Sequence, residues 1–177
     1  MTSPKKSWTR SSDPIRCLGI DPGIGRMGFG VVEQIGSKYR ACSFGCLETP
    51  SDMSVPQRLD ELYRGLREQI NGCSPHFMAV EKLYFGRNTT TAENVWQARG
   101  VALLVGAQND LFVLEPKPSE AKITVCGDGR AEKSQVQRMV QVILSLKEIP
   151  RPDDAADALA IALAGLALLP TSTIGRR

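Results

Sequence analysis

The sequence predicts an α/β fold, a mixed sheet with helices on both of its faces. Three short strand-like runs come first, and from residue 55 onward segments of helical periodicity alternate with further strands. Strands joined directly pair antiparallel and strands joined through a helix pair in parallel, so this order predicts a mixed sheet. The first run, CLGIDPG at residues 17–23, ends on a carboxylate before a Pro-Gly turn. It therefore delivers one acid to the carboxyl edge of the sheet, where α/β folds place their chemistry.

Composition limits the kind of protein. The chain has 177 residues, 42% hydrophobic and 23% charged, which fits one ordinary globular domain. We expect this domain to span residues 15–169, between a polar, basic leader at 1–14 that lacks a secretory signal and a loose tail at 170–177. Five cysteines without a C-x-x-C pair, and a single histidine, argue against zinc and favour a reducing cytoplasm. The net charge of +3 is compatible with a polyanionic partner, and the alanine-rich apolar stretch at 155–169 is too short to span a bilayer.

The remaining elements follow from periodicity and turn residues. Residues 27–34 and 39–49 are expected to be strands of consecutive antiparallel hairpins. A helix begins at Val55, with Pro56 in its first turn and apolar residues at helical spacing: Leu59, Leu62, Leu66 and Ile70. Residues 76–85 form the fourth strand, and the capping-box segment TTAE at 90–93 opens a helix to about residue 109. The order is completed by a strand, a short helix, a longer helix and a last helix from Asp153, over residues 111–115, 119–125, 131–146 and 153 onward.

A glycine motif in the first hairpin is misleading. GIGRMG at residues 23–28 matches G-x-G-x-x-G, the dinucleotide-binding pattern. That pattern needs a helix N-terminus behind the glycines to hold a pyrophosphate, and here a strand follows. We therefore expect the glycines to let a backbone or a nucleic-acid strand pass close to the edge of the sheet.

Acidic residues at three places are candidates for the chemistry. Asp21 follows the first strand, although an Asp-Pro-Gly sequence is also simply a good turn. Glu81 falls in the middle of the strand at 76–85, where burial is costly unless the acid is solvated, paired or metal-bound, or faces outward from an edge strand. At the start of the last helix, Asp154 and Asp157 share one face, although acids there also cap the helix.

Together these acids indicate a metal site. Four clustered carboxylates would repel one another and shift one another's pKa, and hard divalent cations remove that repulsion. Carboxylate oxygens and water suit Mg²⁺ or Mn²⁺, and a pair of such ions clamps the attacking and leaving oxygens of a phosphodiester.

Basic and aromatic residues surround the predicted site. Seven cations fall mostly on loops and near helix starts, where phosphate contacts or an ordinary solvated surface would explain them: Lys82, Arg87, Lys117, Lys122, Arg130, Lys133 and Arg138. Tyr84 or Phe85, at the end of the fourth strand, could stack on an unpaired base, with core packing as the alternative for one of the two.

Five segments, in order and at characteristic spacing, resemble the RuvC family of bacterial Holliday junction resolvases: GIDPG at 19–23, AVE at 79–81, QARG at 97–100, AEKSQV at 131–136 and DAADALA at 154–160. The resemblance implies a ribonuclease H-like fold with a five-stranded mixed sheet. It also implies a homodimer that nicks two opposing strands of a four-way DNA junction, with the RuvA-RuvB branch-migration complex as a partner. Two Mg²⁺ ions per active site are expected, for which Mn²⁺ can substitute, and hydrolysis would leave ligatable 5′-phosphate ends.

The same resemblance assigns roles to residues. It implies that the catalytic and metal-binding acids are Asp21, Glu81, Asp154 and Asp157, the third at a position where some family members carry histidine. Lys122 and Lys133 match the family's functional lysines, Tyr84 its base-stacking aromatic, and Asp153 is an extra acid without a family role. Two other functions would share parts of this pattern. Actin-like ATPases need two domains of this kind, and a catalytically silent junction-binding protein would have no use for clustered negative charge.

Overall fold

The computed structural model describes residues 13–83 and 89–169. Its five strands form one sheet in the order β3-β2-β1-β4-β5. The strands are β1 (Ile15–Asp21), β2 (Arg26–Ile35), β3 (Lys38–Glu48), β4 (Phe77–Val80) and β5 (Phe112–Leu114). The first three pair antiparallel, and β4 and β5 add in parallel to β1. The predicted mixed sheet is confirmed.

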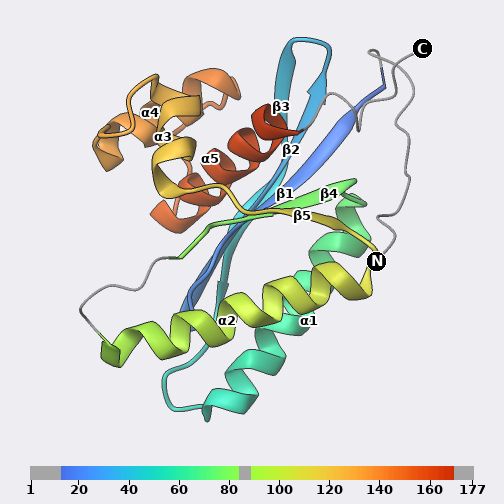
Figure 1. The fold of residues 1–177 in the computed structure, drawn as a ribbon, viewed down its shortest axis with the longest axis vertical. Coiled ribbons are helices and arrows are strands. Elements are labelled where there is room, and N and C mark those ends of the chain that lie inside the picture. Colours follow the sequence, from blue (N-terminus) through green and yellow to red (C-terminus); the bar gives the residue numbers. More distant parts are fainter. Residues whose placement is uncertain (1–12, 84–88, 170–177) are drawn as a thin grey trace.

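Helices cover both faces of this sheet, as Figure 1 shows. Helices α1 (Val55–Cys73) and α2 (Thr89–Gln108) pack on one face. Helices α3 (Pro118–Cys126), α4 (Lys133–Ile143) and α5 (Asp153–Leu168) lie on the other. None of the helices in the described ranges is long and apolar enough to cross a membrane.

Two hydrophobic cores separate these layers. Because side chains alternate along a strand, Leu18 and Ile20 of β1 join the core under α1 and α2, whereas Cys17 joins the core under α5. Every residue of α5 from Ala158 to Leu166 is buried, so this helix is the centre of its layer. The odd-numbered positions of β1, which include Asp21, therefore face α5.

Glycines bring α5 onto the sheet by main-chain contact. A Cβ atom at Gly28 of β2 would overlap the backbone of Asp154, and one at Gly19 of β1 would overlap the backbone of α5 at Ala158 and Ala162. The strand β2 begins within the glycine motif and continues beyond it, so a strand and not a helix lies behind the glycines, as expected. The backbone that passes close is the α5 backbone.

Two element boundaries differ from the prediction. The fourth strand ends at Val80, so Glu81 lies just beyond the strand and not in its middle. Beyond this point Lys82 N–H donates to Pro116 O at 2.9 Å, and a proline has no N–H to extend the ladder with β5. Helix α4 ends at Ile143 because the chain turns at Ser145, which has a φ of 52°. The capping box predicted at 90–93 begins on residues whose side chains lie outside the described part.

Candidate active site

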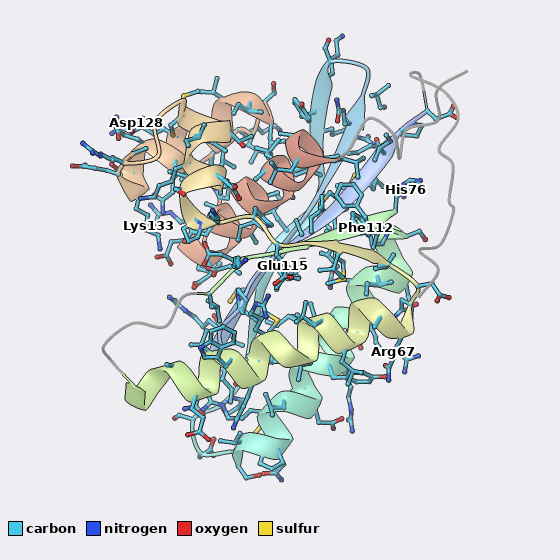
Figure 2. All side chains as sticks on the ribbon, in the orientation of Figure 1. Arg67, His76, Phe112, Glu115, Asp128 and Lys133 are labelled. Carbon is cyan, nitrogen blue, oxygen red and sulfur yellow. The ribbon has the colours of Figure 1, made fainter. Side chains whose placement is uncertain are left out.

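Three carboxylates from separate elements line one cleft on the α3–α5 side of the sheet. Asp21 is the last residue of β1, Glu81 follows the last residue of β4, and Asp157 lies near the start of α5. The cleft has a volume of about 250 Å³, and Lys122 and Lys133 also line it. Figure 2 labels Lys133 on this side of the sheet. The fold thus brings together three of the four predicted acids and both predicted lysines.

The register of β1 and β4 places two of these acids side by side. In this parallel pair Ile20 lies opposite Val80, so the next residues, Asp21 and Glu81, are adjacent at the carboxyl edge. The Glu81 N–H continues the ladder by donating to Ile20 O at 3.1 Å. Asp21 and Glu81 are odd-numbered, like the residues of β1 and β4 that lie in the α5-side core. Because side chains alternate along a strand, both side chains point toward α5.

The cluster strongly perturbs Asp21. Burial is the main cause that raises the pKa of Asp21 from 3.8 to about 8, and the charges of Glu81, Asp157 and Asp154 raise it further. The Lys133 ammonium opposes this rise without cancelling it. In the metal-free protein Asp21 is therefore mostly protonated at neutral pH.

The other two acids of the cleft are perturbed in the same direction. Burial and then the charge of Asp157 raise the pKa of Glu81, against the pull of Lys122. Burial also raises the pKa of Asp157, and its hydrogen bond to Lys133 opposes the rise. For all three carboxyl groups of the cleft, the positive charge nearby is thus too weak to offset the free-energy cost of ionisation.

Two cations bind the acids at the mouth of α5. Lys133 Nζ lies 2.7 Å from Asp153 Oδ2 and 2.9 Å from Asp157 Oδ2, so Asp153, which the resemblance leaves without a family role, holds a lysine of the cleft. Arg26 Nη2 lies 3.1 Å from Asp154 Oδ2 and 3.5 Å from Asp153 Oδ1. Lys133 has its pKa raised, mainly by the hydrogen bond to Asp153.

Asp154 is the acid that the structure sets apart. It is not among the residues that line the cleft. Its Oδ2 is buried and accepts no hydrogen bond, because Arg26 is at ion-pair distance but is not aligned to donate. A buried carboxylate oxygen without a hydrogen bond is costly, and the ion pair with Arg26 offsets part of that cost.

The donor set fits a hard divalent ion. In the described part of the chain, no three acidic, histidine or cysteine side chains lie close enough together to hold a metal ion as they now stand. Lys133 pairs with Asp157 and Arg26 pairs with Asp154, so two of the four acids are engaged with cations of the protein. The groups at the cleft are nevertheless carboxylate oxygens, the ligands that Mg²⁺ and Mn²⁺ prefer, and their raised pKa values indicate an unmet need for positive charge.

The other predicted DNA contacts lie away from the cleft lining. Lys82, Lys117 and Arg130 are exposed, respectively next to Glu81, before α3 and in the loop between α3 and α4. Arg138 lines a separate cleft together with Asp128. Tyr84, Phe85 and Arg87 lie outside the described residues.

Sequence reasoning missed two arginines near these acids. Arg26 begins β2 and reaches the mouth of α5, while Arg99 of α2 donates to the Glu81 carbonyl. Arg26 gave no local signal, because its partners are far away in the sequence. Arg99 stood out only as a lone charge in the long apolar stretch of a helix, within the QARG segment.

The sequence also matches known proteins. The family model described as crossover junction endodeoxyribonuclease RuvC matches residues 17–165. The chain belongs to the RuvC family.

Relatives match over nearly their whole length. A crossover junction endodeoxyribonuclease RuvC of Chloroflexus aggregans is 52% identical over 157 residues, covering 89% of this chain and 96% of the relative. One from Desulforamulus reducens is 49% identical over 146 residues, covering 82% and 90%. The solved structure of T. thermophilus RuvC in complex with Holliday junction substrate has a TM-score of 0.84 and 34% identity, covering 90% of this chain and 97% of that one. The yeast mitochondrial Holliday junction resolvase Ydc2, with a TM-score of 0.61 at 16% identity, shows the fold alone.

Membership in the RuvC family confirms two of the predictions. The fold is the ribonuclease H-like fold of RuvC structures. The enzyme class is a divalent-metal-dependent endodeoxyribonuclease, which hydrolyses phosphodiester bonds.

Proposed function

We propose that this protein resolves Holliday junctions, cutting DNA at the cleft formed by Asp21, Glu81 and Asp157. The observation that carries the proposal is the convergence of these acids from β1, β4 and α5, with two lysines, in one cleft of a RuvC fold. The junction as substrate is supported by the T. thermophilus relative, which was solved with that DNA.

We assign the metal ligands to Asp21, Glu81, Asp154 and Asp157, and the metal to Mg²⁺, with Mn²⁺ as a substitute. The raised pKa of Asp21, about 8, and the buried Asp154 oxygen without a hydrogen bond support this assignment. When bound, two such ions supply an attacking water of lowered pKa and positive charge at the departing 3′ oxygen, so that the product keeps a 5′-phosphate.

The lysines of the cleft have separate tasks. Lys122, in α3, lines the cleft, and we assign its ammonium to contact with a non-bridging oxygen of the scissile phosphate. Lys133 begins α4 and donates to Asp157 and Asp153, so it holds the start of α5 in place while facing the same phosphate. Charge that develops on the phosphate thus meets donors that are already oriented.

Binding of the junction extends beyond the cleft. We assign phosphate contacts that carry no sequence information to three exposed cations that do not line the cleft: Lys82, Lys117 and Arg130. We assign a further phosphate contact to Arg87 and base stacking to Tyr84. The protein acts as a homodimer, since a two-fold dimer presents two equivalent sites to two opposing strands, and it works with the RuvA-RuvB complex. The cytoplasm is the proposed compartment, in keeping with five free cysteines.

The test is cleavage of a synthetic four-way junction with end-labelled strands. Wild-type protein with Mg²⁺ or Mn²⁺ is expected to give paired nicks in opposing strands, and Asp21→Asn and Glu81→Gln to give none while still binding the junction in EDTA. Glu68→Gln, an exposed change on α1, is the matched control and should cut normally. If wild-type protein binds the junction but cuts it with neither metal, the silent junction-binding protein is the correct alternative.

A further inference from the structure

Arg99 is a buried arginine on the opposite side of the sheet from the cleft. It lies in α2, and its side chain is only 9% exposed. A buried guanidinium is costly unless it is paired and hydrogen-bonded, so its partners indicate why it is there.

Those partners are the first residues beyond two neighbouring strands. Arg99 Nη2 pairs with the carboxylate of Glu115, which follows β5, and Nε donates to the main-chain carbonyl of Glu81, which follows β4, at 3.2 Å. The guanidinium also stacks over Trp96, 5.6 Å from the ring centroid. Figure 2 labels Glu115 beside the end of β5.

The ladder between β1 and β4 explains why the Glu81 carbonyl needs this donor. In a parallel pair with residue 81 opposite residue 21, the N–H of residue 81 donates to the carbonyl of residue 20, and the carbonyl of residue 81 accepts from the N–H of residue 22. The first bond is present, from Glu81 to Ile20 at 3.1 Å. The second cannot form, because residue 22 is Pro22, which has no N–H.

Arg99 supplies the missing donor from α2. With both polar groups of the Glu81 main chain hydrogen-bonded, and the Lys82 N–H held by Pro116 at 2.9 Å, the peptide units on either side of Glu81 have little freedom. What remains free is the Glu81 side chain, which enters the cleft. Arg99 itself does not line the cleft.

We infer that Arg99 is a positioning residue, which fixes Glu81 by making the hydrogen bond that Pro22 cannot make. The inference rests on the proposed function of Glu81 in cleavage. The Asp-Pro-Gly turn that places Asp21 removes one ladder donor, and α2 restores it from the other face of the sheet.

The experiment compares variants of the two partners of one ion pair. Arg99→Ala removes the donor to Glu81, whereas Glu115→Gln weakens the ion pair and leaves that donor in place. Both should lower the free energy of unfolding, but only Arg99→Ala should lower kcat for junction cleavage, by about 10²-fold, because a misplaced catalytic group costs that much. The Kd for the junction in EDTA should stay within about twofold for both, since neither residue lines the cleft.

Two further variants separate charge from hydrogen bonding. Arg99→Lys keeps a cation near Glu115 but lacks the Nε donor, so its kcat should remain low. Adding Pro22→Ala to Arg99→Ala returns an N–H at the ladder position, and it should recover at least tenfold of the lost kcat. Amide hydrogen exchange in metal-free protein gives a readout independent of activity, because the Glu81 N–H should exchange faster in Arg99→Ala than in Glu115→Gln.

The inference is overturned if Arg99→Ala keeps the wild-type kcat, if Glu115→Gln loses as much kcat as Arg99→Ala, or if Pro22→Ala recovers none of the loss. Failure of the proposed function looks different, since wild-type protein itself would then cut no junction. If Arg99→Ala does not fold, Arg99→Lys and the exchange measurement carry the comparison with Glu115→Gln.

Discussion

Replacing Asp21 by asparagine should stabilise the metal-free protein increasingly as pH rises. Because the folded-state pKa of Asp21, about 8, lies above its usual 3.8, the folded protein holds this proton more tightly than the unfolded chain. The resulting stability is fully present below about pH 4 and is lost as pH rises through 8. Asparagine is neutral at every pH and does not lose this contribution.

The magnitude follows from the proton linkage. Between pH 5 and pH 7 the folded state holds about one more proton than the unfolded state at this site, which costs wild-type protein about 1.4 kcal/mol per pH unit relative to Asp21→Asn. Over these two pH units the two stabilities should diverge by about 3 kcal/mol, as an order of magnitude.

Urea unfolding in EDTA at pH 5, 6 and 7 measures this divergence directly. Glu68→Gln removes one negative charge from the exposed face of α1 and controls for net charge. If wild-type protein and Asp21→Asn keep a constant difference in free energy of unfolding across this range, the cluster does not perturb Asp21 as described.

Three other outcomes are expected. Mg²⁺ at a hundredfold excess over its Kd should raise the free energy of unfolding of wild-type protein by about 2.7 kcal/mol in thermal unfolding, and leave that of Asp21→Asn unchanged. Equal stabilisation of both proteins would exclude Asp21 as a ligand. Gly28→Ala should lower the free energy of unfolding, measured in urea, by about 1–3 kcal/mol, because the new methyl group meets the α5 backbone. Gly72→Ala, with open space around it, should not lower this free energy. Similar values for both variants would contradict the close approach of α5 to β2. Leu159 is fully buried, and Leu159→Ala should lower the free energy of unfolding by about 2–5 kcal/mol. Leu168 is 42% exposed, and Leu168→Ala should lower it much less. The reverse order would contradict the position of the hydrophobic core.

Local patterns were sufficient to predict most of the fold. The spacing of Leu62, Leu66 and Ile70 defined α1, and all three are buried as that spacing requires. The apolar run before Asp21 defined β1, and the strand β2 after the glycine motif excluded a dinucleotide site. These signals are local because the periodicity of a helix or a strand is visible in residues that are close in the sequence.

The details that the sequence could not provide depend on distant partners. The sequence pattern predicts Glu81 inside a strand, because nothing local indicates that Pro116 interrupts the next ladder. The pairing of Arg26 with Asp154 joins residues 128 positions apart, and Asp153 acquires its role only because Lys133 reaches it. Asp154 was predicted at the same point as the other acids, but a residue pattern could not reveal that its side chain stands outside the cleft.

The main-chain contact between α5 and the strands β1 and β2 has a consequence for engineering. At Gly19 and Gly28 the spacing between helix and sheet is set by backbone atoms, with no side chain in between that could repack. Changes of size elsewhere in the α5-side core should then be absorbed at the far end of the helix, leaving Asp157 nearly where it is. The α5-side core could therefore be varied for thermal stability while Asp157 keeps its position, provided that Gly19 and Gly28 are kept.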